Sequence, residues 1–461
     1  MNDLDEEITW LSRLVMARYA REGIPVERVD CGSGAIVSDR FILDELGDFL
    51  QNVAALTPLC GDASGIAWAL RLVRTTRHPR FRRGGLFETF AFPTRRWRRL
   101  QGMGLAFPYW NLDTLTGLVA LHELLARTGH EAEAAEVAAD VRGVITALAE
   151  RAMRHGLLRY GYHPGSGISL PLVSPQLTGY VAEELIRFGA ISGEPGIVAL
   201  AGALLRAECA TPAFRERGLF CAQVLGPAAP ILRTGLRRLG KRHFFDPMLT
   251  KDNTLPAFAL LALERLMPAG ADWARGARRR WREAVDAHFR TGDGDYRTFA
   301  GAASEARLTF NHSMIELEIE TYVQTGDTAA LECAERLSRR WLSLQTPRGL
   351  VAEGAGTAWR RRAFLDPQVD LAIDLLKLGE LTGHAAWTDA ARAIFTAIRR
   401  DFRLPAGYAW EVDAETGDVR ETVIEVKYLG LLLKGYLALR EVEAGRSLRG
   451  SPLVWMLLRD R

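Results

Sequence analysis

The sequence predicts an all-α fold built from helical hairpins, and three observations predict it. Apolar residues recur at helical spacing: Ile315, Ile319 and Val323 share one face of a first helix, and a second apolar face follows in 330–344. Between them, residues 325–327 (Thr-Gly-Asp) form a stop and a start, because glycine accepts the left-handed conformation and Asp or Thr caps a helix. The unit recurs, with turn glycines at positions 129, 193, 270, 326 and 383.

The recurrence gives the expected organisation of the whole chain. Complete hairpins are expected at 112–148, 175–209, 252–289, 310–346 and 366–402. Two more first helices are expected at 41–56, with a return helix at 64–73, and from 421 to 442. Residues 1–461 are thus expected to form one domain of six or seven hairpins. Its long loops are expected at 74–110, 156–175, 211–250, 291–310, 347–366 and 403–420.

The remaining segments receive simpler expectations. Residues 4–22 form an amphipathic pattern that predicts a helix, and 23–40 read as a glycine-containing loop. Residues 404–420 are expected to form a short strand hairpin with its turn at Thr416-Gly417.

Composition narrows the functional class. The chain has 461 residues, 48% hydrophobic, and a formal net charge of +3, which argues against a nucleic-acid partner. Its five cysteines show no CxxC or Cys/His ligand spacing, so we expect no metal and no cofactor. The first residues are acidic and no run of 18 apolar residues occurs, which predicts a cytoplasmic protein without a membrane span.

Two basic segments allow two interpretations each. Residues 71–99 combine many arginines with interleaved aromatic residues, and 219–242 form an apolar run followed by a basic one. In the first interpretation, the arginines of 71–99 pair with carboxylates elsewhere and 219–242 is a buried connection. In the second interpretation, both segments contact an anionic partner. The anionic partner would be an acidic sugar or a membrane surface that the protein binds peripherally.

Hairpins in series, with a long loop before each first helix, resemble the (α/α) toroid. The resemblance implies a ring of inner helices surrounded by outer ones, with a central cleft where the inner helices begin. Many members of this class act on sugars, including glycosidases, sugar epimerases, uronyl C5-epimerases and polysaccharide lyases. Asn311 before the turn at 325–327, and Gln176 before the turn at 192–194, are similar in layout to glucuronyl C5-epimerases.

Polar and aromatic residues near the starts of the inner helices are the candidate site. For Asp252, Asp366 and Asn311 a helix cap is the favoured explanation, whereas acids further inside need a wet cavity or a partner such as Lys251, Lys377 or Lys427. The candidate catalytic residues are Asp48, His312, Glu316, Asp370 and Glu425. The candidate substrate-binding residues are Tyr109, Trp110, Asn111, Tyr162, His163, Gln176, Asp252, Asn253, Asn311, Trp359, Arg360, Gln368 and Trp410.

Three functions remain open at this point. Paired carboxylates on inner helices favour a glycoside hydrolase acting on an oligosaccharide or polysaccharide, which needs two such groups across the bond. The first alternative is a uronate C5-epimerase or lyase, in which His312, Tyr162 and His163 serve as acid and base and residues 360–362 hold the carboxylate. The second alternative is a non-catalytic helical scaffold whose inner polar residues only pair with one another.

Overall fold

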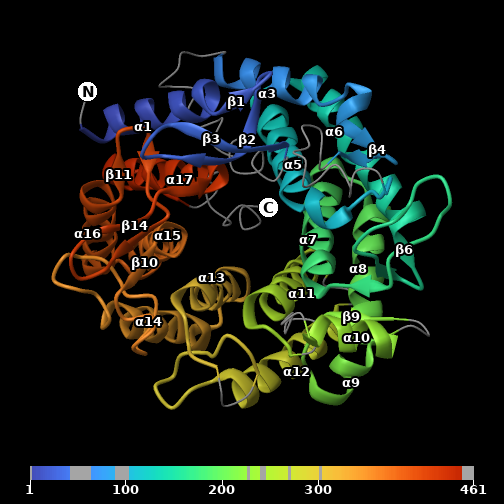
Figure 1. The fold of residues 1–461 in the computed structure, drawn as a ribbon. Helices are drawn as coiled ribbons and strands as arrows, with labels where there is room; N and C mark the ends of the chain where they lie inside the picture. Colours follow the sequence, from blue (N-terminus) through green and yellow to red (C-terminus); the bar gives the residue numbers. More distant parts are fainter. Residues whose placement is uncertain are drawn as a thin grey trace.

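The computed structural model describes residues 3–41, 64–88, 103–225, 229–238, 246–267, 271–300 and 304–448. In this part of the chain, six helices form an inner ring (Figure 1). They are α5 (Leu112–Arg127), α7 (Pro175–Ser192), α11 (Leu255–Leu266), α13 (Leu308–Thr325), α15 (Leu365–Thr382) and α17 (Val426–Glu443). Consecutive members of the ring contact one another from α5 round to α17. The predicted toroid of helical hairpins is therefore confirmed.

Each of the first five inner helices packs against an outer helix that follows it in the chain. The outer helices are α6 (Glu131–Ala147), α8 (Pro195–Cys209), α12 (Asp272–Phe289), α14 (Thr328–Leu342) and α16 (Ala385–Asp401). The glycines at the turns explain the sharp reversals. Gly326 has φ +75° and Gly383 has φ +70°, in the left-handed region that a side chain would strain. Asp327 caps α14 by accepting a hydrogen bond from the backbone N–H of Ala329 at 3.0 Å.

The N-terminal segment closes the ring on the outside of α17. Helix α1 (Asp3–Arg13) continues into η1 (Leu14–Arg18) and packs on α17. Helix α3 (Ser64–Thr75) confirms the expected return helix and is joined to α6 by an Arg74–Glu136 ion pair of 2.7 Å. The inner helix expected at 41–56, with Asp48, lies almost wholly outside the described residues.

A small antiparallel sheet joins segments near the two ends of the described chain. Two of its strands lie where a loop was expected. Residues 23–40 were expected to be a loop, but they contain β2 (Ile24–Asp30) and most of β3 (Ala35–Phe41), and β1 (Ala20–Arg21) ends the expected helix early. Strand β15 (Val423–Glu425) pairs with β2 in the register Val423↔Asp30, Ile424↔Val29. The β-branched residues of IPVERVD and AIVSDRF explain the strands, because they suit a half-buried pleated surface.

The long loops at the starts of the inner helices contain short strands and helical turns. The expected hairpin is confirmed as β13 (Glu411–Asp413) with β14 (Val419–Glu421), and β10 (Arg362–Phe364) pairs with β13 on its other edge. The other short strands are β4 (Arg82–Arg83), β5 (Leu86–Phe87), β6 (Met153–Arg154), β7 (Leu157–Leu158), β8 (Leu172–Val173), β9 (Gln223–Val224), β11 (Arg403–Leu404) and β12 (Gly407–Tyr408). The short helices are η2 (Pro79–Phe81), η3 (Pro108–Asn111), η4 (Leu148–Ala152), α9 (Pro212–Arg217), α10 (Ala229–Arg238) and η6 (Leu249–Thr254).

Four amide side chains near the starts of inner helices hold these loops in place, and we call them the amide clamps. In each, the amide oxygen accepts a hydrogen bond from one backbone N–H, and the amide nitrogen donates to the carbonyl of the same residue. Asn311 clamps Tyr296 in this way, with both hydrogen bonds at 2.8 Å. The other clamps are Asn111 on Phe87, Asn253 on Phe220 and Gln368 on Val351.

The clamps give four expected substrate-binding residues a different role. Asn111, Asn253, Asn311 and Gln368 are at most 3% exposed, and their amides are used by backbone groups. A fifth, Asp252, accepts a hydrogen bond from the N–H of Met248 at 2.9 Å, which is a capping role at the start of η6. Buried backbone N–H and C=O groups of a loop need partners, and the clamps supply them. We therefore assign these five residues to the scaffold of the mouth.

The clamps make a stability prediction. Replacing Asn311 by Leu keeps the volume but leaves the N–H and C=O of Tyr296 without partners, and each such buried group costs about 1–3 kcal/mol. We expect Asn311→Leu to lower the free energy of unfolding by at least about 2 kcal/mol in urea denaturation. The control is Gln176→Leu, a half-buried amide that accepts a hydrogen bond from a side chain, the Tyr109 hydroxyl. An equal loss in both variants would contradict the clamp.

Candidate active site

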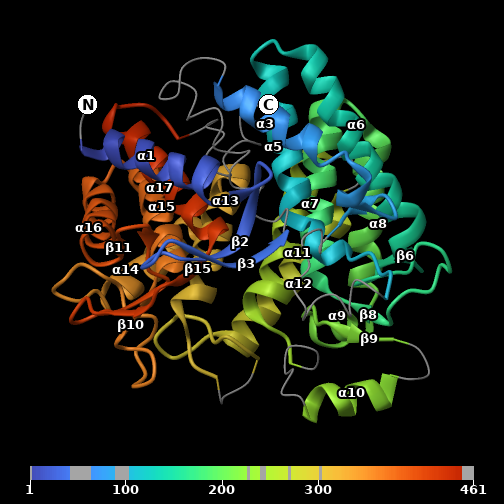
Figure 2. The ribbon, with the colours of Figure 1, turned by 45° about the horizontal axis from the view of Figure 1, so that its top comes forward.

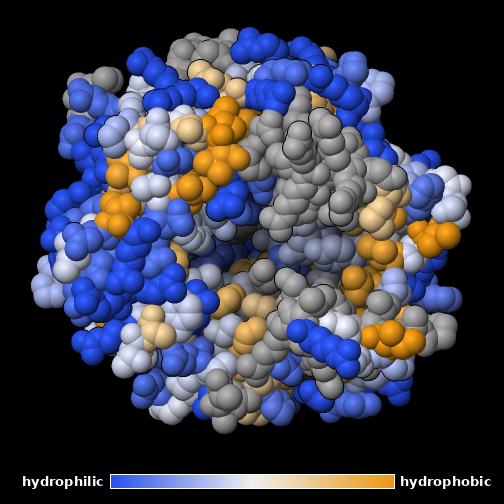
Figure 3. All heavy atoms as spheres, in the orientation of Figure 1, coloured by the Kyte–Doolittle hydropathy of each residue, from blue (hydrophilic) through white to orange (hydrophobic). Residues whose placement is uncertain are grey.

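Polar side chains follow the inward faces of two neighbouring inner helices. On α13, His312, Glu316 and Glu320 are spaced i, i+4, i+8, so they lie on one side of the helix. On α15, Asp366, Asp370 and Asp374 repeat the same spacing. Figure 3 shows that the surface is hollowed in the middle of the ring. The two acidic faces belong to the interior of a ring that opens to solvent.

The two faces meet at a small cavity. Its volume is about 20 Å³, and it is lined by His312, Glu316, Asp370, Ile373, Asp374, Lys377 and Lys434. The Lys377 ammonium donates to Glu316 Oε1 at 2.9 Å and lies 3.9 Å from Asp374 Oδ1. His312 Nε2 lies 3.5 Å from Asp370 Oδ2. A space of this size with polar walls can hold a water molecule.

The structure thus brings together three of the expected catalytic residues, His312, Glu316 and Asp370. Glu425 lies on β15 and pairs with Lys427 at 3.2 Å, and it is not among the residues that line this cavity. Asp48 is outside the described residues. The pairing of Glu316 with Lys377 is what a scaffold would also show. However, a scaffold whose inner polar residues only pair with one another does not explain the hollow ring or the buried carboxylate oxygens that have no hydrogen-bond partner.

The pKa values of two carboxyl groups on these faces are shifted in opposite directions. Burial alone would raise the pKa of Glu316, but the charge and hydrogen bond of Lys377 outweigh it and lower that pKa below its usual range. Burial raises the pKa of Asp366 well above its usual range, and repulsion by Asp370 and Glu353 adds to the effect. Asp366 Oδ1 is buried and has no hydrogen-bond partner. The protonated form is therefore favoured at Asp366 and the ionised form at Glu316.

Deeper in the ring, further acids lie near the Lys377–Glu316 pair. Burial raises the pKa of Glu320 to about 7, and that of Glu183 on α7 well above its usual range. Glu320 Oε1 and Asp374 Oδ2 are buried without a hydrogen-bond partner. Lys377 is fully buried, so it is the cation that offsets this acidic floor.

Aromatic side chains line the loops around the mouth. Trp410 packs against Tyr428 of α17 with ring centroids 4.6 Å apart, and Tyr109 stacks on Tyr160 at 4.6 Å. The Tyr109 hydroxyl donates to Gln176 Oε1 at 2.9 Å, and Trp110 touches Tyr109 edge-on at 5.4 Å. These half-buried rings fit the expected role of stacking on a sugar face.

The other expected substrate-binding residues lie in the surrounding loops. Tyr162 is 1% exposed and donates to the carbonyl of Gly84 at 2.7 Å, and burial raises its pKa to about 12. His163 Nδ1 accepts from the N–H of Ser166 at 3.0 Å. The Trp359 ring lies 3.9 Å from the guanidinium carbon of Arg307, and Arg360 lies 3.7 Å from Glu415. Tyr162 is thus a packing residue of the loop rather than a free acid.

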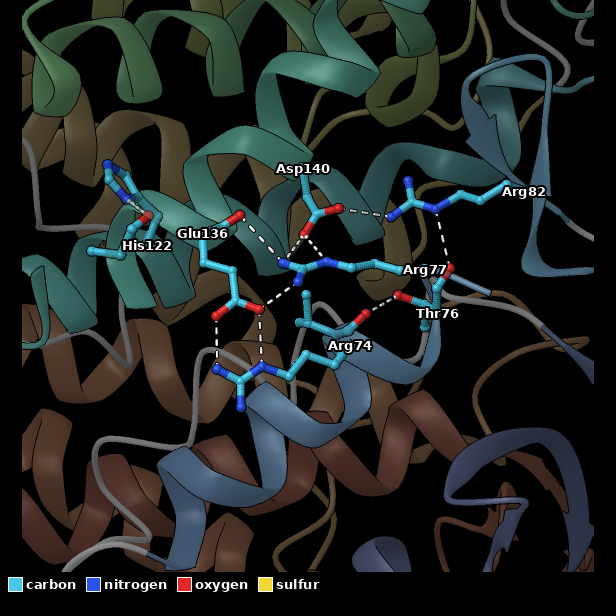
Figure 4. Close-up of polar contacts among 9 residues, drawn as sticks. Arg74, Thr76, Arg77, Arg82, His122, Glu136 and Asp140 are labelled. Atoms are coloured by element: carbon cyan, nitrogen blue, oxygen red, sulfur yellow. Dashed lines mark hydrogen bonds and ion pairs between the residues drawn. The ribbon is translucent and has the colours of Figure 1, made fainter. Parts of the chain in front are cut away.

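The described half of the arginine-rich segment 71–99 is held by carboxylates of the protein itself. Figure 4 shows Arg74, Arg77 and Arg82 converging on Glu136 and Asp140 of α6. Arg77 Nη2 lies 2.6 Å from Asp140 Oδ2, and Arg82 Nη2 lies 3.0 Å from Asp140 Oδ1. These ion pairs favour the structural interpretation of this half, whereas 89–99 lies outside the described residues.

The apolar part of the second basic segment belongs to the core. Leu219, Phe220 and Val224 are at most 1% exposed, so they are not available to lipid. Within the described ranges, no group of three or more His, Cys, Asp or Glu side chains is arranged to hold a metal ion. No helix in those ranges is both long and apolar enough to cross a bilayer.

Sequence reasoning undervalued two residues of this site. Asp366 was interpreted as a helix cap, yet it is a carboxyl group on this face of α15 whose pKa is raised by burial, with an oxygen that has no hydrogen-bond partner. Lys434, on α17, was missed, although it lines the cavity. The spacing of Asp366, Asp370 and Asp374 on one helix was a usable signal, because three acids on one face of a buried helix need a cavity or a cation.

The raised pKa of Glu320 predicts a pH dependence of stability. Below about pH 4.5, Glu320 is protonated in both the folded and unfolded states. Between about pH 4.5 and 7 the unfolded chain ionises it first, so stability falls by up to about 3 kcal/mol as pH rises. Glu320→Gln should therefore match wild type at pH 4.5 and exceed it at pH 8 in urea denaturation. Glu332→Gln, an exposed change on α14, is the control; a constant difference between Glu320→Gln and wild type at all pH values would refute the assignment.

Comparison with known proteins supports the fold. No protein-family model and no curated protein sequence matches the chain. An alpha-1,2-mannosidase from Trichoderma reesei is similar in structure, with a TM-score of 0.69, 13% identity, and coverage of 95% of this chain and 93% of that one. A D-mannose isomerase (TM-score 0.55, 11% identity, 95% and 97% covered) and an alpha-mannanase from Bacteroides thetaiotaomicron (0.53, 10%, 96% and 97%) are also similar. The chain therefore has the (α/α) toroid fold of these three structures.

Proposed function

We propose that the protein is a glycoside hydrolase whose active site is the interior of the ring. The observation that carries the proposal is a pair of inner-helix carboxyl groups of two kinds: burial raises the pKa of Asp366, which favours its acid form, and Lys377 lowers the pKa of Glu316, which favours its ionised form. Glycoside hydrolysis uses one group of each kind. The fold similarity to an alpha-1,2-mannosidase and an alpha-mannanase supports a sugar as the substrate.

In this proposal, the two carboxyl groups divide the reaction between them. Asp366 gives its proton to the glycosidic oxygen as the bond from the anomeric carbon to that oxygen breaks. Glu316 accepts a proton from a water molecule in the cavity, and the oxygen of that water bonds to the anomeric carbon. Lys377 acts as a positioning residue, because its ammonium keeps Glu316 ionised and fixed. The stacked rings at the mouth hold the sugar.

The epimerase or lyase alternative has weaker support. Its proposed carboxylate-binding arginines are already paired, since Arg361 lies 2.9 Å from Asp413 and Arg362 lies 2.6 Å from Glu411. The similarity to a D-mannose isomerase keeps sugar isomerisation as the second candidate, with the His312–Asp370 pair as acid and base. Product analysis separates the two, because only hydrolysis creates new reducing ends.

Turnover on a panel of neutral and acidic oligosaccharides tests the proposal. We expect Asp366→Asn and Glu316→Gln each to lower kcat about 10²–10⁴-fold, since each removes one proton-transfer step. Lys377→Met should lower kcat and shift the acidic limb of the pH–rate profile upward, because Glu316 loses the charge that keeps it ionised. Glu305→Gln, an exposed change in the loop before α13, is the matched control. Full activity of both Asp366→Asn and Glu316→Gln would exclude this mechanism.

We also propose a peripheral membrane contact, now restricted to α10. This helix stands away from the ring in Figure 2, and Ile231 on it is 78% exposed. Its sequence, APILRTGLRR, combines apolar residues with arginines. An exposed apolar side chain beside basic residues suits the interface of an anionic bilayer.

Sedimentation with vesicles tests this contact. We expect the protein to pellet with anionic vesicles at low salt, to bind neutral vesicles weakly, and to lose part of its binding in 0.5 M salt. The double change Ile231→Ser and Arg238→Gln should weaken pelleting. Protein that stays in the supernatant with anionic vesicles at low salt would rule out the contact.

A further inference from the structure

Arg159 is a buried arginine without a partner. It is 8% exposed, and its Nε and Nη1 are buried without any hydrogen-bond partner. Among the described residues no carboxylate pairs with it. Burial lowers its pKa, and the positive charge of Arg154 lowers it further. An arginine stays charged in proteins, and an unpaired buried charge is costly, so this guanidinium is poised for an anion.

A second orphaned donor lies on the same face. Arg159 forms an antiparallel bridge with Val173 of β8, and Val173 pairs with Gln223 of β9. Residues directly opposite in an antiparallel ladder point to the same face, so Arg159 and Gln223 flank Val173. Gln223 Nε2 is also buried without a hydrogen-bond partner. Two chain segments thus place unused N–H donors on one face, and donors alone suit an acceptor with several oxygens.

The position of these donors connects them to the mouth of the ring. Tyr160, the next residue, stacks on Tyr109, whose hydroxyl bonds to Gln176 at the start of inner helix α7. Figure 2 places β8 and β9 at the edge of the ring beside α8 and α9. The acidic floor around Lys377 binds the reacting bond in our proposed function. A basic rim can hold a charged group further along the same substrate.

We propose that Arg159 and Gln223 form an oxyanion subsite at the rim, which receives a phosphate, sulfate or carboxylate group carried by the sugar substrate. Arg154 adds positive charge, while its own donors are occupied by the carbonyls of Met153 and Gly167. The guanidinium fork would hold two oxygens of the group, and the Gln223 amide a third. The assignment of the group to a sugar rests on the proposed function, but the subsite itself does not.

Binding of simple anions tests the subsite without any substrate. Isothermal titration calorimetry would use phosphate, sulfate and acetate, each against chloride at equal ionic strength. We expect at least one of the three oxyanions to bind wild type. Its dissociation constant should rise at least tenfold in Arg159→Met and severalfold in Gln223→Leu. Arg151→Gln, which removes a nearby exposed arginine, is the matched control and should keep the affinity.

Stability gives a readout that a purely structural arginine would not produce. Because Arg159 is unpaired, Arg159→Met should unfold at the same temperature as wild type or a higher one without anions, and should lose the rise that the bound anion gives wild type. If Arg159→Met does not fold, Arg159→Lys replaces it, because it keeps the charge without the guanidinium fork. The dissociation constant of the anion should still rise at least tenfold in Arg159→Lys. Equal anion affinity in wild type and the Arg159 variant, or no oxyanion binding in wild type, overturns the subsite.

A separate measurement of kcat/KM tests the substrate class. If the subsite is correct, kcat/KM for an acidic oligosaccharide should fall at least tenfold in Arg159→Met, while kcat/KM for its neutral analogue stays unchanged. A protein that binds phosphate but turns over no sugar would refute the hydrolase and keep the anion site. A protein that hydrolyses sugars but binds no oxyanion would support the hydrolase and refute the anion site.

Discussion

The amide clamps are the interaction on which the mouth of this ring depends. An (α/α) toroid places its long loops where the inner helices begin, and loops are the least constrained part of a fold. Each clamp joins one residue of a loop to the first turn of an inner helix, or to a residue one or two positions before it, through a pair of hydrogen bonds. A side chain that stands on such a loop is then as well positioned as one on the helix itself. Preorganisation of this kind is what a site for sugar chemistry requires.

The environment of each carboxyl group matters more than its position in the chain. Asp366 and Glu316 lie on neighbouring inner helices and differ mainly in what surrounds them. Lys377 lies beside Glu316, whereas Asp370 and Glu353 face Asp366. The same ring therefore shifts the pKa of one carboxyl group down and that of another up, because Lys377 outweighs burial at Glu316 and nothing comparable does so at Asp366. A fold that carries many acids inward can produce such a difference by placing one lysine.

Much of the fold followed from the sequence, because helix periodicity and turn glycines are local signals. The hairpins that turn at Gly193, Gly326 and Gly383 are examples, since each of these glycines adopts the left-handed conformation that the sequence analysis predicted for the turn. The strands β2 and β3 were missed in part because β2 pairs with β15, which is distant in the sequence, while β3 pairs only with β2 among the described strands. The clamps were missed for a related reason: Asn311 and Gln368 look like ligand-binding amides until their partners in the preceding loop are known.

The candidate site, like the fold, was predicted from the sequence only in part. The i, i+4, i+8 spacing of His312, Glu316 and Glu320 was legible, and the cavity contains two of these three residues. Asp366 was taken for a cap, because its raised pKa arises first from burial and then from repulsion by Asp370 and by Glu353 of the preceding loop, and burial is a property of the assembled ring. The isolation of Arg159 was equally hidden, since the absence of a partner is a property of the assembled structure.

The pairing of β2 with β15 also has a consequence for the order of folding. Five hairpins contain only local contacts, so they can form as the chain leaves the ribosome, whereas Val29 and Ile424 are separated by nearly the whole sequence. The ring cannot close until β15 and α17 have been synthesised. Until then the inner faces of α13 and α15, with their buried acids and Lys377, stand open to water, where they are well solvated. A polar lining thus makes the unfinished ring less prone to aggregation than an apolar one would be.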